Sequence, residues 1–305
     1  NTVFDFFYDM KAKEKTWKAW GSIVPAFEYD KDKSFFDLMV PNDDTAKHSV
    51  LLETLFDLGK PTFFTGESGV GKSAIIQTLL NTLKEKDVQP ININMSAQTS
   101  SLRTQQAIED KLEQKRRGVL GAQPGKRVAI FIDDINMPAK EFYGAQPPVE
   151  LLRLFIDRRG LYKRGEWAWR KVEDTTVIAC AAPPSGGRAD LSPRFTRIFN
   201  MVNLPQPSEG TLGIIFGSIL SNFLATGFID KVKALGDSAV ASTVEVYNRM
   251  KTELRPTPDR FHYLFNLRDV SKVIQGLCMT KPASVGSDEI FMKVWVNETM
   301  RVFYD

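Results

Sequence analysis

The chain has 305 residues, of which 43 % are hydrophobic, so it can bury the core of one large domain and one smaller domain. Its 40 basic and 37 acidic residues leave a formal net charge of +3, which provides no electrostatic argument for nucleic-acid binding. Neither a signal-peptide pattern nor a membrane-spanning apolar run is evident, so we predict no membrane partner.

Residues 1–35 are rich in aromatic side chains with charged residues between them. Aromatic and basic residues together can stack on nucleic acid, but interleaved acids such as Asp5 and Glu28 favour an extended segment that packs on the rest of the module. We therefore predict no nucleic-acid partner. The chain starts at Asn1 without a methionine, so we expect it to be a fragment of a longer protein.

A phosphate-binding loop is predicted between a strand and a helix. Residues 61–65 are apolar and β-prone, and residues 74–83 carry apolar side chains at helical spacing. Between them Gly-Glu-Ser-Gly-Val-Gly-Lys-Ser matches G-x-x-x-x-G-K-[ST]. The loop residues predicted to surround the phosphates are Gly66, Gly69, Val70, Gly71, Lys72 and Ser73. The glycines let backbone N–H groups turn toward phosphate oxygens at a helix N-terminus.

Two side chains of this loop have predicted roles. Lys72 is expected to reach the β- and γ-phosphates of a nucleoside triphosphate, and the Ser73 hydroxyl is expected to bind Mg²⁺. The alternative is a glycine-rich turn with an incidental lysine, which the strand–loop–helix context disfavours.

The rest of the chain predicts a parallel sheet followed by helices. Residues 44–58 and the first half of 96–125 have helical periodicity, the latter ending in the basic run 115–117. Apolar strands are predicted at 127–132, 175–182 and 198–204, which indicates a parallel sheet covered by helices on both faces. Four helices follow, at 212–224, 239–254, 266–277 and 288–303. We divide the chain into an N-terminal segment (1–35), a large α/β subdomain (36–205) and a small helical subdomain (206–305).

Paired carboxylates follow the second predicted strand. Asp133 at such a strand end is expected to hold Mg²⁺, and Asp134 is placed where an attacking water could be oriented or deprotonated. Asp134 is one methylene shorter than glutamate, so its carboxylate is set back from that water. The cysteines, Cys180 and Cys278, lie among apolar residues and are interpreted as buried free thiols in a reducing compartment.

Three arginines are candidates for phosphate contacts. Arg194 and Arg197 precede the last predicted strand, and we favour Arg194 as an arginine finger acting in trans, with Arg197 as the alternate. A surface ion pair is the other interpretation. Arg268 starts a helix, where a cation opposes the dipole, so it either faces an anion or pairs with an acid such as Asp269.

Four phrases carry a resemblance to a known family. They read Phe-Ile-Asp-Asp-Ile-Asn-Met-Pro (131–138), Tyr-Gly-Ala-Gln-Pro-Pro-Val-Glu-Leu-Leu-Arg (143–153), Asn-Leu-Pro-Gln-Pro-Ser-Glu (203–209) and Phe-Asn-Leu-Arg-Asp (265–269). With their order along the chain, they resemble the AAA+ ATPases, and more narrowly one ring module of a dynein heavy chain. The chain looks most like the third AAA+ module of an axonemal dynein.

The resemblance implies an AAA+ P-loop α/β fold with a helical lid, and ATP or ADP with Mg²⁺ as cofactors. Val40 and Pro41 match the segment beside adenine, Arg194 the finger for a neighbouring module, and Arg268 the lid arginine for this module's own γ-phosphate. Implied partners are the neighbouring AAA+ modules of the same heavy chain. Intermediate chains, light chains and microtubules would be reached only through other parts of that chain, in the cytoskeleton of a cilium or flagellum.

One position departs from the family pattern. Ala182 stands where many dynein modules have a sensor asparagine that holds the attacking water. With that amide missing and Asp134 short, we expect intact nucleotide binding and slow hydrolysis, hence a regulatory site. A fully active ATPase and a structural module with an empty site are the alternatives. A kinase or GTPase is disfavoured by the predicted lid and by the absence of an Asn-Lys-x-Asp sequence.

Overall fold

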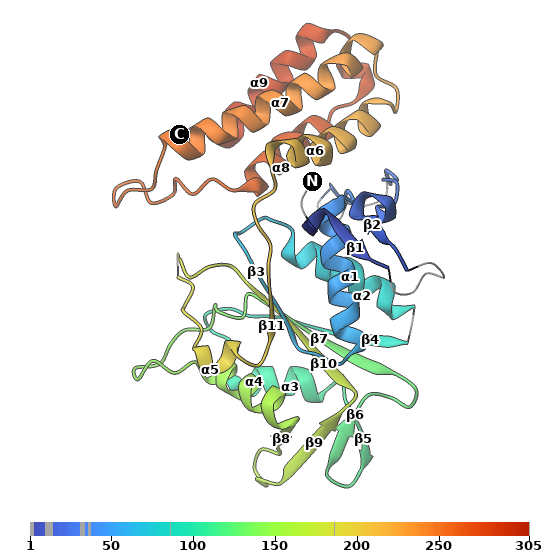
Figure 1. The fold of residues 1–305 in the computed structure, drawn as a ribbon. Coiled ribbons are helices and arrows are strands. Elements are labelled where there is room, and N and C mark those ends of the chain that lie inside the picture. The colour runs from blue at the N-terminus through green and yellow to red at the C-terminus, as the bar shows by residue number, and fades with distance from the viewer. Residues whose placement is uncertain are drawn as a thin grey trace. The chain divides into compact units, whose positions relative to one another are not determined.

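The computed structural model describes residues 3–9, 15–30, 34–35, 38–85, 87–185 and 187–304. They form two compact units (Figure 1): Lys47–Gln206, and the described parts of Asn1–Ala46 together with Pro207–Asp305. Residues 1–2, 10–14 and 31–33 of the predicted N-terminal segment lie outside the described residues. The domain divisions made from the sequence stay predictions. Among the described helices, none combines the length and apolar character needed to cross a bilayer.

The unit Lys47–Gln206 is built on a parallel sheet of five strands in the order β11–β3–β10–β7–β4. Their bounds are β3 (Thr62–Thr65), β4 (Val88–Asn94), β7 (Arg127–Asp133), β10 (Thr175–Ala181) and β11 (Asn200–Asn203). The middle residues of β7 and β10 are buried without alternation, as strands covered on both faces require. The four strands predicted from the sequence are therefore confirmed, whereas β4 was missed.

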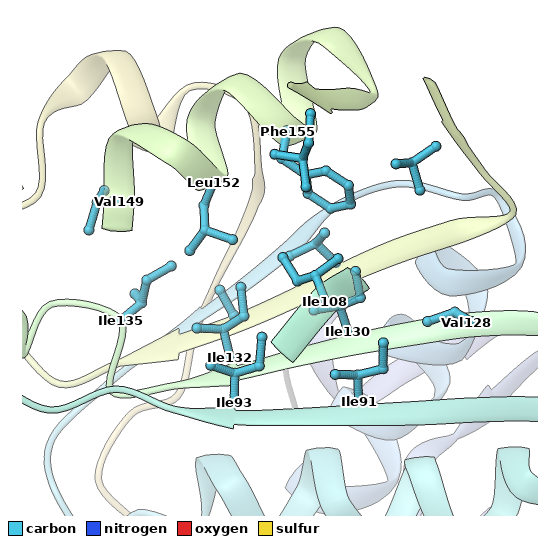
Figure 2. Close-up of a cluster of buried hydrophobic side chains, with 14 of the residues drawn as sticks. Ile91, Ile93, Ile108, Val128, Ile130, Ile132, Ile135, Val149, Leu152 and Phe155 are labelled. Carbon is cyan, nitrogen blue, oxygen red and sulfur yellow. The ribbon is translucent and has the colours of Figure 1, made fainter. Parts of the chain in front are cut away.

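Helices cover both faces of this sheet (Figure 1). One face carries α3 (Ser101–Glu109), α4 (Pro147–Arg158) and α5 (Pro193–Thr196), and the other carries α1 (Asp43–Asp57) and α2 (Lys72–Lys84). Figure 2 shows Leu152 and Phe155 of α4 packed over isoleucines of β4 and β7. Burial of each such side chain stabilises the fold by roughly 1.5–3 kcal/mol, so this apolar layer fixes the sheet that positions the phosphate-binding loop.

A second, smaller sheet flanks the first, with strand order β5–β6–β9–β8. Its strands are β5 (Glu113–Arg116), β6 (Val119–Gly121), β8 (Gly160–Tyr162) and β9 (Trp169–Glu173). The prediction of a helix extending to residues 115–117 was wrong, because α3 ends at Glu109 and β5 follows. Lys115 pairs with Asp174, and Arg116 lies 3.0 Å from Glu173. Asp174 and Glu173 are remote in sequence from the basic run. They hold it against β9 and the turn after β9, so it does not lie at a helix end.

The unit that contains the C-terminus is a helical bundle with its own core. Its helices are α6 (Glu209–Leu224), α7 (Asp230–Glu253), α8 (Leu267–Cys278) and α9 (Asp288–Phe303). The short helix η4 (Pro282–Ser284) lies between α8 and α9 in the chain. Leu220, Val273 and Phe291 are fully buried there, and Phe35 packs against the same cluster. The four predicted helices are confirmed, although α7 begins earlier than predicted, at Asp230.

The described part of the N-terminal segment belongs to the same unit as the bundle. It forms η1 (Val3–Asp5), a two-stranded antiparallel sheet of β1 (Phe6–Tyr8) and β2 (Trp17–Ala19), and η2 (Trp20–Ile23). Phe7 stacks on Trp20 with ring centroids 4.6 Å apart, so the aromatic residues of this segment pack on one another.

Candidate nucleotide site

The phosphate-binding loop joins the end of β3 to the start of α2. Gly66, Gly69 and Gly71 all have positive φ angles, of 153°, 88° and 91°. A Cβ atom at Gly66 would lie 2.5 Å from the carbonyl oxygen of Leu204, so only glycine fits there. Gly71 is the N-cap of α2 and gives it no side-chain cap, which leaves N–H groups of the first turn for another acceptor.

Lys72 is a buried cation in this loop. Its side chain is held back on the loop, where Nζ donates hydrogen bonds to the carbonyl oxygens of Gly66 (2.9 Å) and Glu67 (2.7 Å). The residue is only 8 % exposed, and among the described residues it forms no ion pair. Burial lowers the pKa of Lys72 from its ordinary value, although the negative charges of Asp134 and Asp133 oppose this shift; the positive charge of Arg188 adds to it. A buried cation with no salt bridge among the described residues, beside an uncapped helix N-terminus, fits a phosphate group.

The carboxylates predicted at the end of β7 lie beside α2 and β10. Asp133 Oδ1 accepts hydrogen bonds from the backbone N–H of Asp134 (2.9 Å) and from the thiol of Cys180 (2.8 Å). Cys180 Sγ also lies 3.9 Å from the hydroxyl oxygen of Ser73. Ser73 and Asp133 therefore approach the same sulfur atom from two elements. Their hard oxygen donors suit Mg²⁺.

Asp134 has a left-handed backbone conformation, with φ of 49°, and its side chain is 45 % exposed. Its Oδ1 atom lies 3.9 Å from Nε of Arg188 in the loop that follows β10. Arg188 Nε is buried and has no hydrogen-bond partner among the described residues. The candidate catalytic carboxylate therefore has a cationic neighbour from a different element.

Ala182, one residue beyond β10, is buried and presents no polar side chain at this end of the sheet. Its carbonyl oxygen accepts a hydrogen bond of 2.8 Å from Nδ2 of Asn136. Asn136 is 2 % exposed, and its Oδ1 has no partner in the described part of the chain. The Asn136 amide thus lies beside Ala182, the position where the resemblance predicts a sensor side chain, and it is hydrogen-bonded to the backbone there.

The predicted arginines lie on exposed positions. Arg194 is on α5 and Arg197 is its C-cap, and the fully buried Phe195 between them anchors the short helix. Arg268 is exposed in the first turn of α8, where Asn266 and Asp269 form a capping box. Asp269 is 3.0 Å from Lys272, and no described acid pairs with Arg268.

Val40 is buried and Pro41 is half-buried, immediately before α1. Val40, Pro41 and Arg268 belong to the unit with the helical bundle, whereas the phosphate-binding loop belongs to Lys47–Gln206. The helical bundle also has a groove of about 770 Å³ between α6 and α7, which contains none of the predicted site residues.

Two residues of the site were missed in the sequence. Cys180 was interpreted as a buried free thiol, and Arg188 was not singled out. The signal for Cys180 lies in the strand order of the sheet. Because β10 pairs with both β3 and β7, its last residues lie between the loops that follow those two strands. Neither residue has a diagnostic spacing from the phosphate-binding loop.

Comparison with known proteins identifies the family. Residues 27–207 match the family described as the P-loop containing dynein motor region, and residues 216–305 match the dynein heavy chain ATPase lid domain. The chain belongs to the dynein heavy chain family. Its AAA+ P-loop α/β fold with a following lid is thereby confirmed, and membership in this ATPase family implies nucleotide binding.

Several dynein heavy chains are similar over almost the whole chain. Dynein axonemal heavy chain 6 of Homo sapiens is 45 % identical over 287 residues, which are 94 % of this chain and 7 % of that protein. The dynein-1-alpha heavy chain of the flagellar inner arm I1 complex of Chlamydomonas reinhardtii is 39 % identical, over 100 % of this chain and 7 % of its own length. The chain thus spans a small part of the dyneins it matches.

Proposed function

We propose that this dynein segment is a regulatory nucleotide-binding module of an axonemal heavy chain, most like the third AAA+ module of the ring. It would hold ATP or ADP with Mg²⁺ and hydrolyse ATP slowly, and its nucleotide state would tune the main motor site elsewhere in the chain. The whole protein would act on microtubules in the axoneme of a cilium or flagellum. Microtubules, intermediate chains and light chains would be contacted through other parts of the heavy chain.

The binding half of this proposal rests on the residues around the phosphate-binding loop. Lys72 and the N–H groups at the start of α2 would bind the phosphates, and Ser73 with Asp133 would bind Mg²⁺. Val40 and Pro41 would lie beside adenine, and Arg268 would contact the γ-phosphate from the lid. Mg²⁺ would neutralise phosphate charge when bound.

The proposal of slow hydrolysis rests on a contrast between the phosphate-binding loop and the strand ends opposite it. The loop has all the parts needed for binding, while the carboxyl ends of β7 and β10 present a shortened acid and no sensor amide. Asp134 is set back by one methylene and lies near Arg188, and Ala182 offers no side-chain hydrogen bond to water. A reacting group displaced by about 1 Å lowers the rate by on the order of a hundredfold.

Arg194 would complete the site of a neighbouring module of the same heavy chain. It is exposed on α5, whose buried Phe195 fixes the helix in the core. An always-ionised guanidinium on a rigid element can stabilise the charge of a transferring phosphoryl group. Arg197, also exposed, is the alternate finger.

The test is a single-turnover measurement on the heavy chain that contains this segment, with the main motor site disabled. A parallel Lys72→Ala variant gives the background, and the nucleotide that remains after purification is identified by chromatography. Retained nucleotide with slow phosphate release supports the proposal. Phosphate release at motor-like rates would establish a fully active site instead, and no bound nucleotide at any concentration would establish a structural module.

A further inference from the structure

Cys180 lies where three elements of the proposed site meet. It is fully buried at the end of β10, the strand between β3 and β7. Its sulfur is 2.8 Å from Oδ1 of Asp133 at the end of β7 and 3.9 Å from Oγ of Ser73 at the start of α2. These are the two residues proposed to hold Mg²⁺, so the thiol bridges the metal-binding groups of the site.

The direction of these hydrogen bonds follows from the number of protons. A thiol has one proton, and a carboxylate can only accept, so Cys180 donates to Asp133. The Ser73 hydroxyl must then donate to the sulfur. The positions of the three groups therefore make Cys180 a donor to Asp133 and an acceptor from Ser73.

The same contacts restrict the Asp133 carboxylate. Two groups donate hydrogen bonds to this carboxylate, the Cys180 thiol and the Asp134 N–H, and both donate to Oδ1. Among the described residues no donor bonds to Oδ2, whose lone pairs are left for a cation or a water bound to it. A carboxylate held by two donors, one from the residue that follows it and one from β10, loses less rotational freedom when it binds a metal.

We propose that Cys180 is a positioning residue of the nucleotide–metal site, whose thiol orients the Asp133 carboxylate with Ser73 and so strengthens divalent-cation binding. This inference rests on the proposed function, because it requires Ser73 and Asp133 to be the metal-binding residues. The sulfur acts through Asp133 and is not itself a metal ligand, since a hard cation prefers oxygen.

The experiment measures metal affinity without hydrolysis. The chain is loaded with a non-hydrolysable ATP analogue, Mn²⁺ is used in place of Mg²⁺, and bound Mn²⁺ is measured by electron paramagnetic resonance. In Cys180→Ala we expect roughly tenfold weaker Mn²⁺ binding, the effect of losing a group that orients a ligand. Cys180→Ser keeps a donor and should retain most of the affinity. Cys278→Ala, which removes the half-buried thiol in the helical bundle, should behave as wild type.

Analogue affinity without metal separates this inference from the proposed function. It should be the same in all four proteins, because the thiol does not contact the phosphate-binding N–H groups. Wild-type affinity for Mn²⁺ in Cys180→Ala, or equal losses in the Ala and Ser variants, would overturn the positioning role and leave nucleotide binding intact. A wild-type chain that binds neither analogue nor metal would overturn both.

A spectroscopic measurement covers the case in which Cys180→Ala does not fold. The infrared S–H stretching band of Cys180, assigned by its loss in Cys180→Ser, should lie at lower frequency than that of Cys278. A thiol that donates to a carboxylate has a weakened S–H bond. Equal frequencies for the two thiols would show that no such hydrogen bond exists and would reject the proposal.

Discussion

The two halves of the candidate site differ in how they are built. The phosphate-binding half is one continuous strand–loop–helix segment, in which the buried Lys72 is held by carbonyl groups five and six residues before it. The half that would carry out hydrolysis is assembled from the ends of β7 and β10 and the loop after β10. In our proposal the first half supplies the groups for phosphate binding, and the second has an alanine, Ala182, in place of a sensor amide. The comparison suggests that binding and hydrolysis can be changed separately.

The largest expected effect comes from breaking the binding half. Lys72→Met removes the buried cation while it keeps an unbranched side chain of similar length. We expect ATP affinity, measured by calorimetry or with a fluorescent analogue, to fall by roughly a hundredfold or more, because charge-assisted contacts to phosphate are lost. Lys84→Met at the other end of α2 is the matched control and should bind as wild type. Unchanged ATP affinity in Lys72→Met would show that this loop is not part of the nucleotide site.

The sequence predicted the binding half well because its signals are local. A glycine pattern between an apolar strand and a helix specifies geometry within a few residues, and the strand, loop and helix were found where predicted. Asp133 likewise ends, and Asp134 follows, a strand whose five middle residues are all apolar. The chemistry of these residues was predictable, although their roles remain proposals.

The second half could be predicted only in part, because its contacts connect distant segments. Cys180 bonds to Asp133, 47 residues away in sequence, and this contact depends on the strand order of the sheet. The second sheet was missed for the same reason. Its strands are short and partly charged, and Arg116 lies near Glu173 only because β6 of one hairpin pairs with β9 of the other. A basic run was therefore assigned to a helix end, where local periodicity alone would place it.

The next largest effect should come from repairing the hydrolytic half. The double variant Asp134→Glu, Ala182→Asn lengthens the acid and adds the amide that the site lacks. We expect single-turnover phosphate release to rise by roughly ten- to a hundredfold, because both groups act on the attacking water. ATP affinity should stay within a few-fold of wild type.

Two controls sharpen that experiment. Asp134→Gln, Ala182→Asn provides the same amide without a carboxylate and should remain slow. The repaired variant with Lys72→Met added should release no phosphate above background, because it does not bind ATP. If phosphate release from the repaired site with bound ATP were no faster than from the wild type, the absent amide and the short acid would not be the cause of the proposed slow hydrolysis.

The charge of Lys72 gives a smaller, pH-dependent effect. Burial lowers its pKa below the ordinary value of 10.5. Between the lowered pKa and 10.5 the unfolded chain binds more protons than the folded chain, so this group makes the apo protein more stable as pH rises. ATP affinity should change in the opposite direction, because phosphate favours the protonated lysine. With one linked proton, the loss cannot exceed about tenfold per pH unit.

This pair of opposite slopes can be measured by calorimetric titration and thermal unfolding across the alkaline range. Lys72→Met should lose both contributions, so the difference between it and wild type isolates Lys72 from other titrating groups. If ATP affinity fell with rising pH as steeply in Lys72→Met as in wild type, the pH dependence would come from another residue.

The smallest expected effect on ATP affinity comes from Arg188, which lies near both the acid Asp134 and the lysine Lys72. This cation lies 3.9 Å from Asp134 and also lowers the pKa of Lys72, so it acts on the acid and on the phosphate-binding lysine. Arg188→Gln should weaken ATP binding, because it leaves the Asp134 charge uncompensated near the phosphates. Asp134→Asn alone should slightly tighten binding.

A double-mutant cycle on ATP affinity measures the coupling of Arg188 with Asp134. Both side chains are partly exposed, so we expect a coupling of at most about 1 kcal/mol, or about a fivefold change in affinity, which decreases with salt. The exposed pair Arg249 and Glu245 on α7 is the matched control and should show no coupling to ATP binding. Additive effects of Arg188→Gln and Asp134→Asn at low salt would show that Arg188 does not hold the acid, and the slow hydrolysis would then depend on Ala182 and the length of Asp134 alone.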